Sequence, residues 1–219
     1  MKRIKIQDTF YEPLLCRACE EHLQPWESYG ASLIKGKRIF DFPPPYSVLP
    51  GLPVAEIEYT QFKLLLMSML WRMAAARSEI FQHIALKERS MKKLHAMLKA
   101  KDPGKPDEFG CVITIPFMFP FSQQNLILRT PFFAGPDILK FDGFTMISIM
   151  LDGIYFQFPI GGQSRISKSP ISKSFLGRDG RVIVFIRNVW NITAIWSAIQ
   201  EIVKDPIVQN APKDVHWRD

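Results

Sequence analysis

The sequence contains few of the features that build disulfide frameworks, membrane spans or secretion signals. Only three cysteines occur among 219 residues, too few for a disulfide framework in a chain of this length. The most apolar stretch, residues 64–71, is far shorter than the roughly 20 residues that cross a bilayer. No apolar run follows the basic start MKRIKIQDTF, so we expect no signal peptide, no membrane partner and a cytoplasmic location.

Recognisable catalytic patterns are also missing. The chain has four histidines. It contains no H-E-x2-H pattern, no G-x-S-x-G turn and no Walker element. Triads are recognised by geometry rather than by sequence order, so this absence alone does not exclude an enzyme. The sequence leaves enzymatic activity open and leans towards a non-catalytic protein.

The positive charge is concentrated in two segments of an otherwise ordinary composition. Apolar residues make up 47% and charged residues 22%, and the net charge is +7, as in a folded protein with a real core. Residues 84–105 contain seven lysines and arginines against two acidic residues, and residues 160–181 contain five against one. Local basicity favours an acidic partner such as nucleic acid. The predicted nucleic-acid-binding residues are Lys87, Arg89, Lys92, Lys93, Lys99, Arg165, Lys168, Lys173 and Arg178.

One apolar stretch predicts a buried helix around which the fold is organised. Residues 59–77, YTQFKLLLMSMLWRMAAAR, are rich in Leu, Met and Ala and contain no Gly or Pro. Their apolar side chains point nearly all round the helix, which is typical of a helix packed against several neighbours. Thr60 is the expected N-cap residue.

The other segments predict an α+β fold, with N-terminal helices and a CxxC knuckle followed by a mostly antiparallel sheet backed by a C-terminal helix. A second basic helix is expected over 87–101, with His95 on its apolar face. Four to six strands are expected from residue 109 on, with Leu151-Asp152-Gly153-Ile154 as a tight hairpin and the prolines of the early strands at edges or bulges. Residues 160–181 are expected to form a mobile basic loop, and residues 190–204 the closing helix.

Three regions follow from these patterns, and they can form one continuous domain. Residues 1–50 hold the knuckle and most of a proline-rich linker, residues 36–55, that we expect to lie as a strap across the apolar surface. Residues 51–105 are helical. Residues 106–219 contain the antiparallel strands and the C-terminal helix.

Cys16 and Cys19 have the C-x2-C spacing of a zinc knuckle, in which a tight turn directs two thiolates at one ion at the start of a helix. One such pair is half of a tetrahedral site, so zinc would need further ligands. The candidates are His22, Cys111 or the same pair of a second subunit. The alternative is that both cysteines are small packed residues. Glu20, Glu21 and Glu27 beside the knuckle are candidate Mg²⁺ ligands, and Pro25 predicts the start of a second helix.

The motif LLCRACE with Trp26-Glu27, and FKLLLMSMLWR with KKLHAMLKAKDPG after it, resemble a family of uncharacterised bacterial proteins over about residues 5–160. The LLC-x2-CE element is similar to the second knuckle of treble-clef and HNH-nuclease-like zinc modules. This chain departs from them because no His or Cys precedes Cys16. The resemblance implies no activity of its own, but it suggests a phage-defence or toxin setting.

Three hypotheses follow for the function. The first is a non-catalytic nucleic-acid-associated protein that uses the basic helix and the basic loop. The second is an HNH-like metal-dependent nuclease, which the resemblance alone suggests. The third is a protein-interaction subunit of a larger complex, docking through the proline strap or the apolar sheet.

Overall fold

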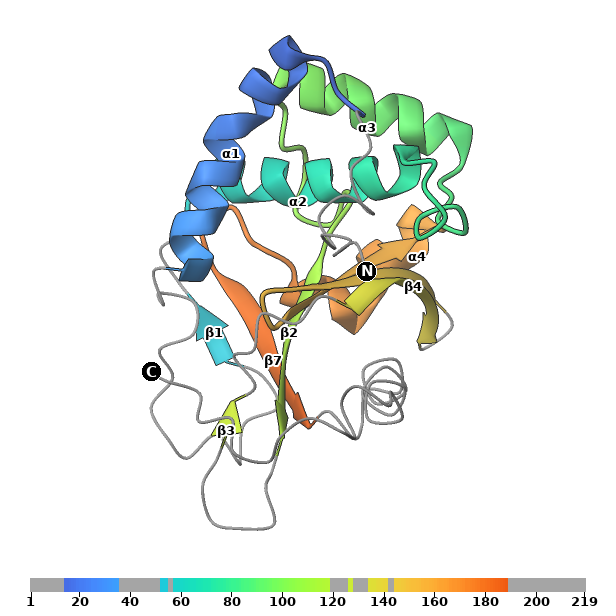
Figure 1. Cartoon of the computed structure of the whole chain (residues 1–219). Coiled ribbons are helices and arrows are strands. Elements are labelled where there is room, and N and C mark those ends of the chain that lie inside the picture. Colours follow the sequence, from blue (N-terminus) through green and yellow to red (C-terminus); the bar gives the residue numbers. More distant parts are fainter. Residues whose placement is uncertain are drawn as a thin grey trace, which may run out of the picture.

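A computed structural model describes residues 14–35, 52–54, 57–118, 126–127, 134–141 and 144–188. Three long helices lie together on one side of a sheet, and a short helical segment lies beside the strands (Figure 1). Among the described residues, no helix is long and apolar enough to span a bilayer.

Helix α1 (Arg17–Lys35) is continuous, and Pro25 lies inside it. The expectation of a second helix starting at Pro25 is therefore wrong. An interior proline removes one helical hydrogen bond and costs about 3 kcal/mol. Leu23, Trp26 and Leu33, which flank Pro25 on both sides, are buried in the same core, and this shared packing holds the two halves in one helix.

Helix α2 (Tyr59–Ala75) is the predicted core helix, and nine of its residues are buried. Its N-cap is Glu58 rather than Thr60. The Glu58 carboxylate accepts hydrogen bonds from the backbone N–H groups of Thr60 (3.2 Å) and Gln61 (2.6 Å). Its negative charge also compensates the positive end of the helix dipole. Helix α2 contacts α1 and α3 (Glu88–Ala100).

Helix α3 confirms the helix predicted over 87–101, with a changed apolar face. Leu94, Met97 and Leu98 are its buried residues. His95 is exposed and stacks on Trp71 of α2, with ring centroids 5.7 Å apart. The helix ends at Ala100, and its C-cap residue Lys101 has φ +54°.

The described strands form one mixed sheet with seven strands. The strand order is β1-β7-β2-β6-β5-β4, and β3 pairs with β2. All pairs are antiparallel except β2 with β7. The bounds are β1 Leu52–Val54, β2 Val112–Met118, β3 Leu126–Ile127, β4 Ala134–Phe141, β5 Phe144–Leu151, β6 Ile154–Ile160 and β7 Val182–Asn188.

Three expectations about the strands meet different outcomes. The hairpin is confirmed, because Asp152 (φ +51°) and Gly153 (φ +75°) form the two-residue turn between β5 and β6. The residues of β1 were expected in the linker, but they pair with β7. Pro116 lies in the inner strand β2 rather than at an edge. It occupies the gap where pairing with β6 ends at Thr114 and pairing with β3 begins at Phe117.

The two faces of the sheet meet different helical segments. Alternate residues of the inner strands, including Ile113, Ile147 and Phe156, share one core with the three long helices. The opposite face carries Val112 and Phe144, which pack against Ile166 and Phe175 of the 163–175 segment. The α+β class is therefore confirmed, with a mostly antiparallel sheet. The expected C-terminal helix over 190–204 and most of the proline strap lie outside the described residues.

Candidate functional site

The cations of α3 are exposed, but two of them are engaged in ion pairs. Lys92 pairs with Glu88 one turn earlier, with 2.6 Å between Nζ and Oε1. Lys93 pairs with Glu108 of the loop that follows the helix. Within the described part of the chain, the other predicted cations of this helix form no ion pair. These are Lys87, Arg89 and Lys99.

The second basic segment is helical rather than a mobile loop, so that prediction is wrong. Helix α4 (Gln163–Lys168) is followed by the 3-10 helix η2 (Pro170–Ser174). Ile166 and Phe175 are buried against one face of the sheet, and Leu176 is buried in the core that contains the long helices. These three apolar residues are the signal for structure within a sequence that is otherwise rich in Ser and Gly. The exposed residues include all four predicted cations, which are Arg165, Lys168, Lys173 and Arg178.

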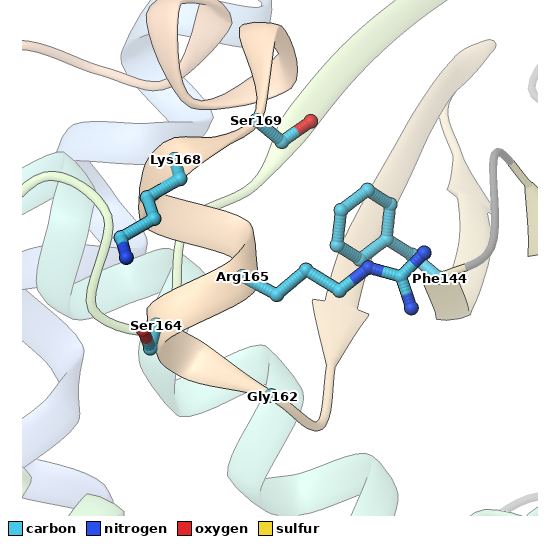
Figure 2. A pocket seen from close by; sticks show the side chains of 6 residues that line it. All are labelled: Phe144, Gly162, Ser164, Arg165, Lys168 and Ser169. Carbon is cyan, nitrogen blue, oxygen red and sulfur yellow. The ribbon is translucent and has the colours of Figure 1, made fainter.

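A pocket of about 650 Å³ lies against α4 and β5 (Figure 2). The Arg165 side chain extends over the Phe144 ring, with its guanidinium carbon 5.0 Å from the ring centroid. Lys168 leaves the helix in another direction (Figure 2). Sequence reasoning missed Phe144 as a lining residue, because only the fold brings β5 to this helix. The other lining residues, Gly162, Ser164 and Ser169, are neighbours of the predicted cations in the sequence.

The two basic segments meet at the 101–110 loop that follows α3. Arg178 donates a hydrogen bond to the Gly104 carbonyl oxygen (3.3 Å), and the Ser167 hydroxyl donates to the Asp107 carboxylate. The Tyr59 hydroxyl also donates to the Gly104 carbonyl (3.0 Å). The loop thus ties the end of α3 to the α4–η2 segment, and its own exposed cations, Lys101 and Lys105, lie between them in the chain.

Lys63 is buried beneath this loop, with a relative exposure of 1%. Its Nζ donates to the carbonyl oxygens of Pro106 and Phe109, both at 3.1 Å. Burial lowers the pKa of Lys63 to about 8, although Cys111, Glu108 and Asp107 oppose that shift. The sequence could have indicated this burial, because Lys63 lies within a predicted helix whose other side chains are apolar on nearly all sides.

Cys16 and Cys19 lie side by side at the start of α1, both exposed, with their sulfurs 3.4 Å apart. The Cys16 carbonyl accepts the first helical hydrogen bond, from Glu20 N–H (3.0 Å). Cys16 is therefore the N-cap residue of the helix. Hydrogen bonds from the Cys19 backbone and then its thiol lower the pKa of Cys16, while the thiol contact raises the pKa of Cys19.

The remaining predicted zinc ligands do not join the pair. His22 Nε2 lies 3.1 Å from the Leu98 carbonyl oxygen, and its ring meets Trp26 edge-on. Cys111 is fully buried, and burial raises the pKa of its thiol to about 12. The described residues contain no group of three or more His, Cys, Asp or Glu side chains that could hold a metal. The thiol pair fits two corners of a tetrahedral site, and zinc stays a prediction.

Two of the three acidic residues beside the thiol pair, Glu21 and Glu27, form ion pairs with different partners. Glu21 pairs with Arg17 (2.9 Å) on the surface of α1. Glu27 pairs with Arg72 of α2 (2.6 Å), and Arg72 also donates to the Ser68 hydroxyl (3.2 Å). These contacts explain Glu21 and Glu27 structurally without a magnesium ion.

A second pocket, of about 470 Å³, adjoins the thiol pair. It lies between the start of α1, Trp71 of α2 and the last turns of α3, and most of its lining is apolar. His22, His95 and Lys99 are its polar and cationic residues.

Comparisons of this chain with protein-family models, with curated proteins and with solved structures return no match.

Proposed function

We propose that this protein binds nucleic acid without catalysis, holding the phosphate backbone with the exposed lysines and arginines of α3, the 101–105 loop, the α4–η2 segment and Arg178 after it. The observation that carries the proposal is the contact of Arg178 and Ser167 with the 101–110 loop. This contact brings two basic segments, about 60 residues apart in the sequence, to one part of the surface.

The charge of these segments supports a polyanionic ligand. Most of their cations form no ion pair within the described residues, and the pairs of Lys92 and Lys93 are at the surface, where such pairs are weak. Lysine and arginine neutralise phosphates without reading base sequence. The surface therefore suits sequence-independent binding.

The pocket of Figure 2 adds a place for a phosphate group beside an aromatic ring. Arg165 can donate two parallel hydrogen bonds to phosphate oxygens, and the hydroxyls of Ser164 and Ser169 can donate as well. A guanidinium that lies over Phe144 has less conformational freedom to lose on binding. We propose that the phosphate backbone of the bound nucleic acid passes over this pocket.

The test is fluorescence anisotropy of labelled single-stranded and duplex oligonucleotides, DNA and RNA, over a range of salt concentrations. The logarithm of the association constant should fall linearly with the logarithm of the salt concentration. Lys168→Glu combined with Arg178→Glu should weaken binding to every sequence and reduce that slope by about two. The reversal of Lys92, Lys93 and Lys99 to Glu should weaken it further.

Lys140→Glu is the matched control. Lys140 is an exposed lysine on the edge strand β4, so its reversal changes the net charge as each single reversal does, but at a position outside the two basic segments. Affinity that is absent, insensitive to salt, or lost equally in the control would contradict the proposal.

A further inference from the structure

The strongest feature that nucleic-acid binding does not use is the thiol pair, whose adjoining pocket shares Lys99 with the proposed binding surface. Cys16 and Cys19 are one helical turn apart, and both side chains are exposed. Their sulfurs lie 3.4 Å apart. A disulfide has sulfurs about 2.05 Å apart and tolerates Cα separations of about 4.4–6.8 Å, a range that includes residues three apart at a helix start. The pair can therefore close into a disulfide by a small side-chain movement.

The third cysteine provides the contrast. Cys111 lies just before β2, is buried to 2% exposure and is fully surrounded by the core. Its burial keeps disulfides in solution from reaching its sulfur. Of the three cysteines, Cys16 and Cys19 are therefore the two whose thiols can react with disulfides in solution.

The pocket beside the pair gives this chemistry a binding site. Its apolar walls include Leu23, Trp71 and Leu98, and Lys99 is its cationic residue. His95 is held by stacking on Trp71. A molecule that combines an apolar part with a carboxylate suits these walls, because Lys99 attracts the carboxylate while the apolar part is removed from water.

We propose that Cys16 and Cys19 are a redox-active dithiol that reduces an anionic disulfide bound in this pocket. One cysteine thiolate attacks a sulfur of the substrate R–S–S–R, which forms a mixed disulfide and releases one R–S⁻ that takes up a proton. The other cysteine loses its proton and attacks the cysteine sulfur of the mixed disulfide, which releases the second R–SH. The protein loses two hydrogen atoms with their electrons, and the substrate gains them.

The first experiment follows the reaction of the purified chain with glutathione disulfide by intact mass and peptide mapping, after free thiols are trapped. The wild-type chain should become two hydrogen atoms lighter, with an internal Cys16–Cys19 bond, and Cys111→Ala should do the same. Cys16→Ser and Cys19→Ser should each stop at a stable glutathione adduct. Wild-type peptide mapping alone tests the internal bond if a variant fails to fold.

Two results would overturn the dithiol. One is a wild-type chain that keeps stable glutathione adducts or does not react. The other is a chain that is purified with zinc bound by both thiols and reacts only after a chelator removes the metal, because the pair would then be a structural ligand set.

The second experiment tests the preference for an anionic substrate. The rate of internal disulfide formation with glutathione disulfide, an anion, is compared with the rate with cystamine, a cation. Lys99→Glu should lower the first rate several-fold relative to the second, whereas Lys140→Glu should leave their ratio unchanged. An unchanged ratio of the two rates in Lys99→Glu would contradict the proposed preference for an anionic disulfide. Neither outcome depends on nucleic-acid binding, because no oligonucleotide is present.

Discussion

At the scale of single residues, Lys63 is the least expected feature of the molecule. Its ammonium group is buried among core residues of α2, and two backbone carbonyls of the 101–110 loop accept its hydrogen bonds. Burial disfavours the charged form more than Cys111, Glu108 and Asp107 favour it, which is why the pKa of Lys63 falls to about 8 from its ordinary value of 10.5. The residue holds the loop that joins the two basic segments, at the cost of burying a charge.

This lowered pKa predicts how stability depends on pH. Between about pH 8 and 10.5, the unfolded chain keeps the Lys63 proton while the folded chain has lost it. Because the unfolded state binds more protons, the free energy of unfolding rises with pH in this window. The free energy of unfolding of the wild type, relative to that of Lys63→Met, should rise by at most about 1.4 kcal/mol per pH unit. Urea unfolding of both proteins across this pH range measures the difference.

Lys92→Met is the control for this prediction, because Lys92 is an exposed lysine on α3. The difference between wild type and Lys92→Met should stay nearly flat over the same pH range. A flat difference for Lys63→Met would mean that its ammonium group is solvated in the folded protein.

At the scale of elements, the contact between the start of β2 and the end of η2 positions the second basic segment. Gly110 lies directly against Phe175, and a methyl group placed on Gly110 would be 2.4 Å from Phe175 Cδ2. Phe175 is 4% exposed and packs with Val112, Phe144 and Ile166. Glycine is therefore required here for the close approach of a backbone to an aromatic ring.

Gly110→Ala should push the Phe175 ring out of its place and destabilise the protein by about 1–3 kcal/mol, as overpacking does. Thermal or urea unfolding measures the loss. The double variant Gly110→Ala with Phe175→Leu should recover part of that loss, because the smaller side chain makes room for the methyl group.

Gly135→Ala is the matched control for the close contact. A methyl group on Gly135 would lie 3.5 Å from Ile80 Cγ2, an ordinary van der Waals distance. Its effect on stability should be small. A neutral Gly110→Ala, or a double variant less stable than both single variants, would contradict the assigned role of Phe175.

The individual elements could largely be predicted from the sequence, because their signals are local. The apolar composition of α2, the apolar residues Leu94 and Leu98 of α3, and the Asp152-Gly153 turn each follow from residues within one element. The tight turn shows this best, since two residues with positive φ determine the geometry of the hairpin.

The contacts between elements could not be predicted in the same way. The segment 160–181 reads as a loop because Ser, Gly and basic residues dominate it, but two short helices bury Ile166 and Phe175 where β2 and β5 offer an apolar face. The pocket of Figure 2 depends on this docking. Pro116 was misplaced for the same reason, because the neighbours of β2 change along its length. Tertiary packing overrode local composition at each of these positions.

At the scale of the whole molecule, the larger of the two apolar clusters joins the three long helices to the sheet. It contains Leu23 of α1, Phe62 of α2, Leu94 of α3 and Phe158 of β6 among its buried residues. Residues of the three expected regions, which can form one continuous domain, all contribute side chains to this core. A shared core couples the helices and the sheet energetically, so we expect the two layers to unfold together.

Hydrogen exchange of the full chain tests this coupling through one substitution in the sheet. Phe158 is fully buried in β6, and Phe158→Leu should lower the global stability by roughly 1–2 kcal/mol. The slowest amides of α2 should then lose as much protection as those of β6, because both exchange through the same global opening. Ile138→Ala on the edge strand β4, where Ile138 is 38% exposed, should leave both sets nearly unchanged. Loss of protection confined to β6 would show that the helical layer and the sheet open as separate units.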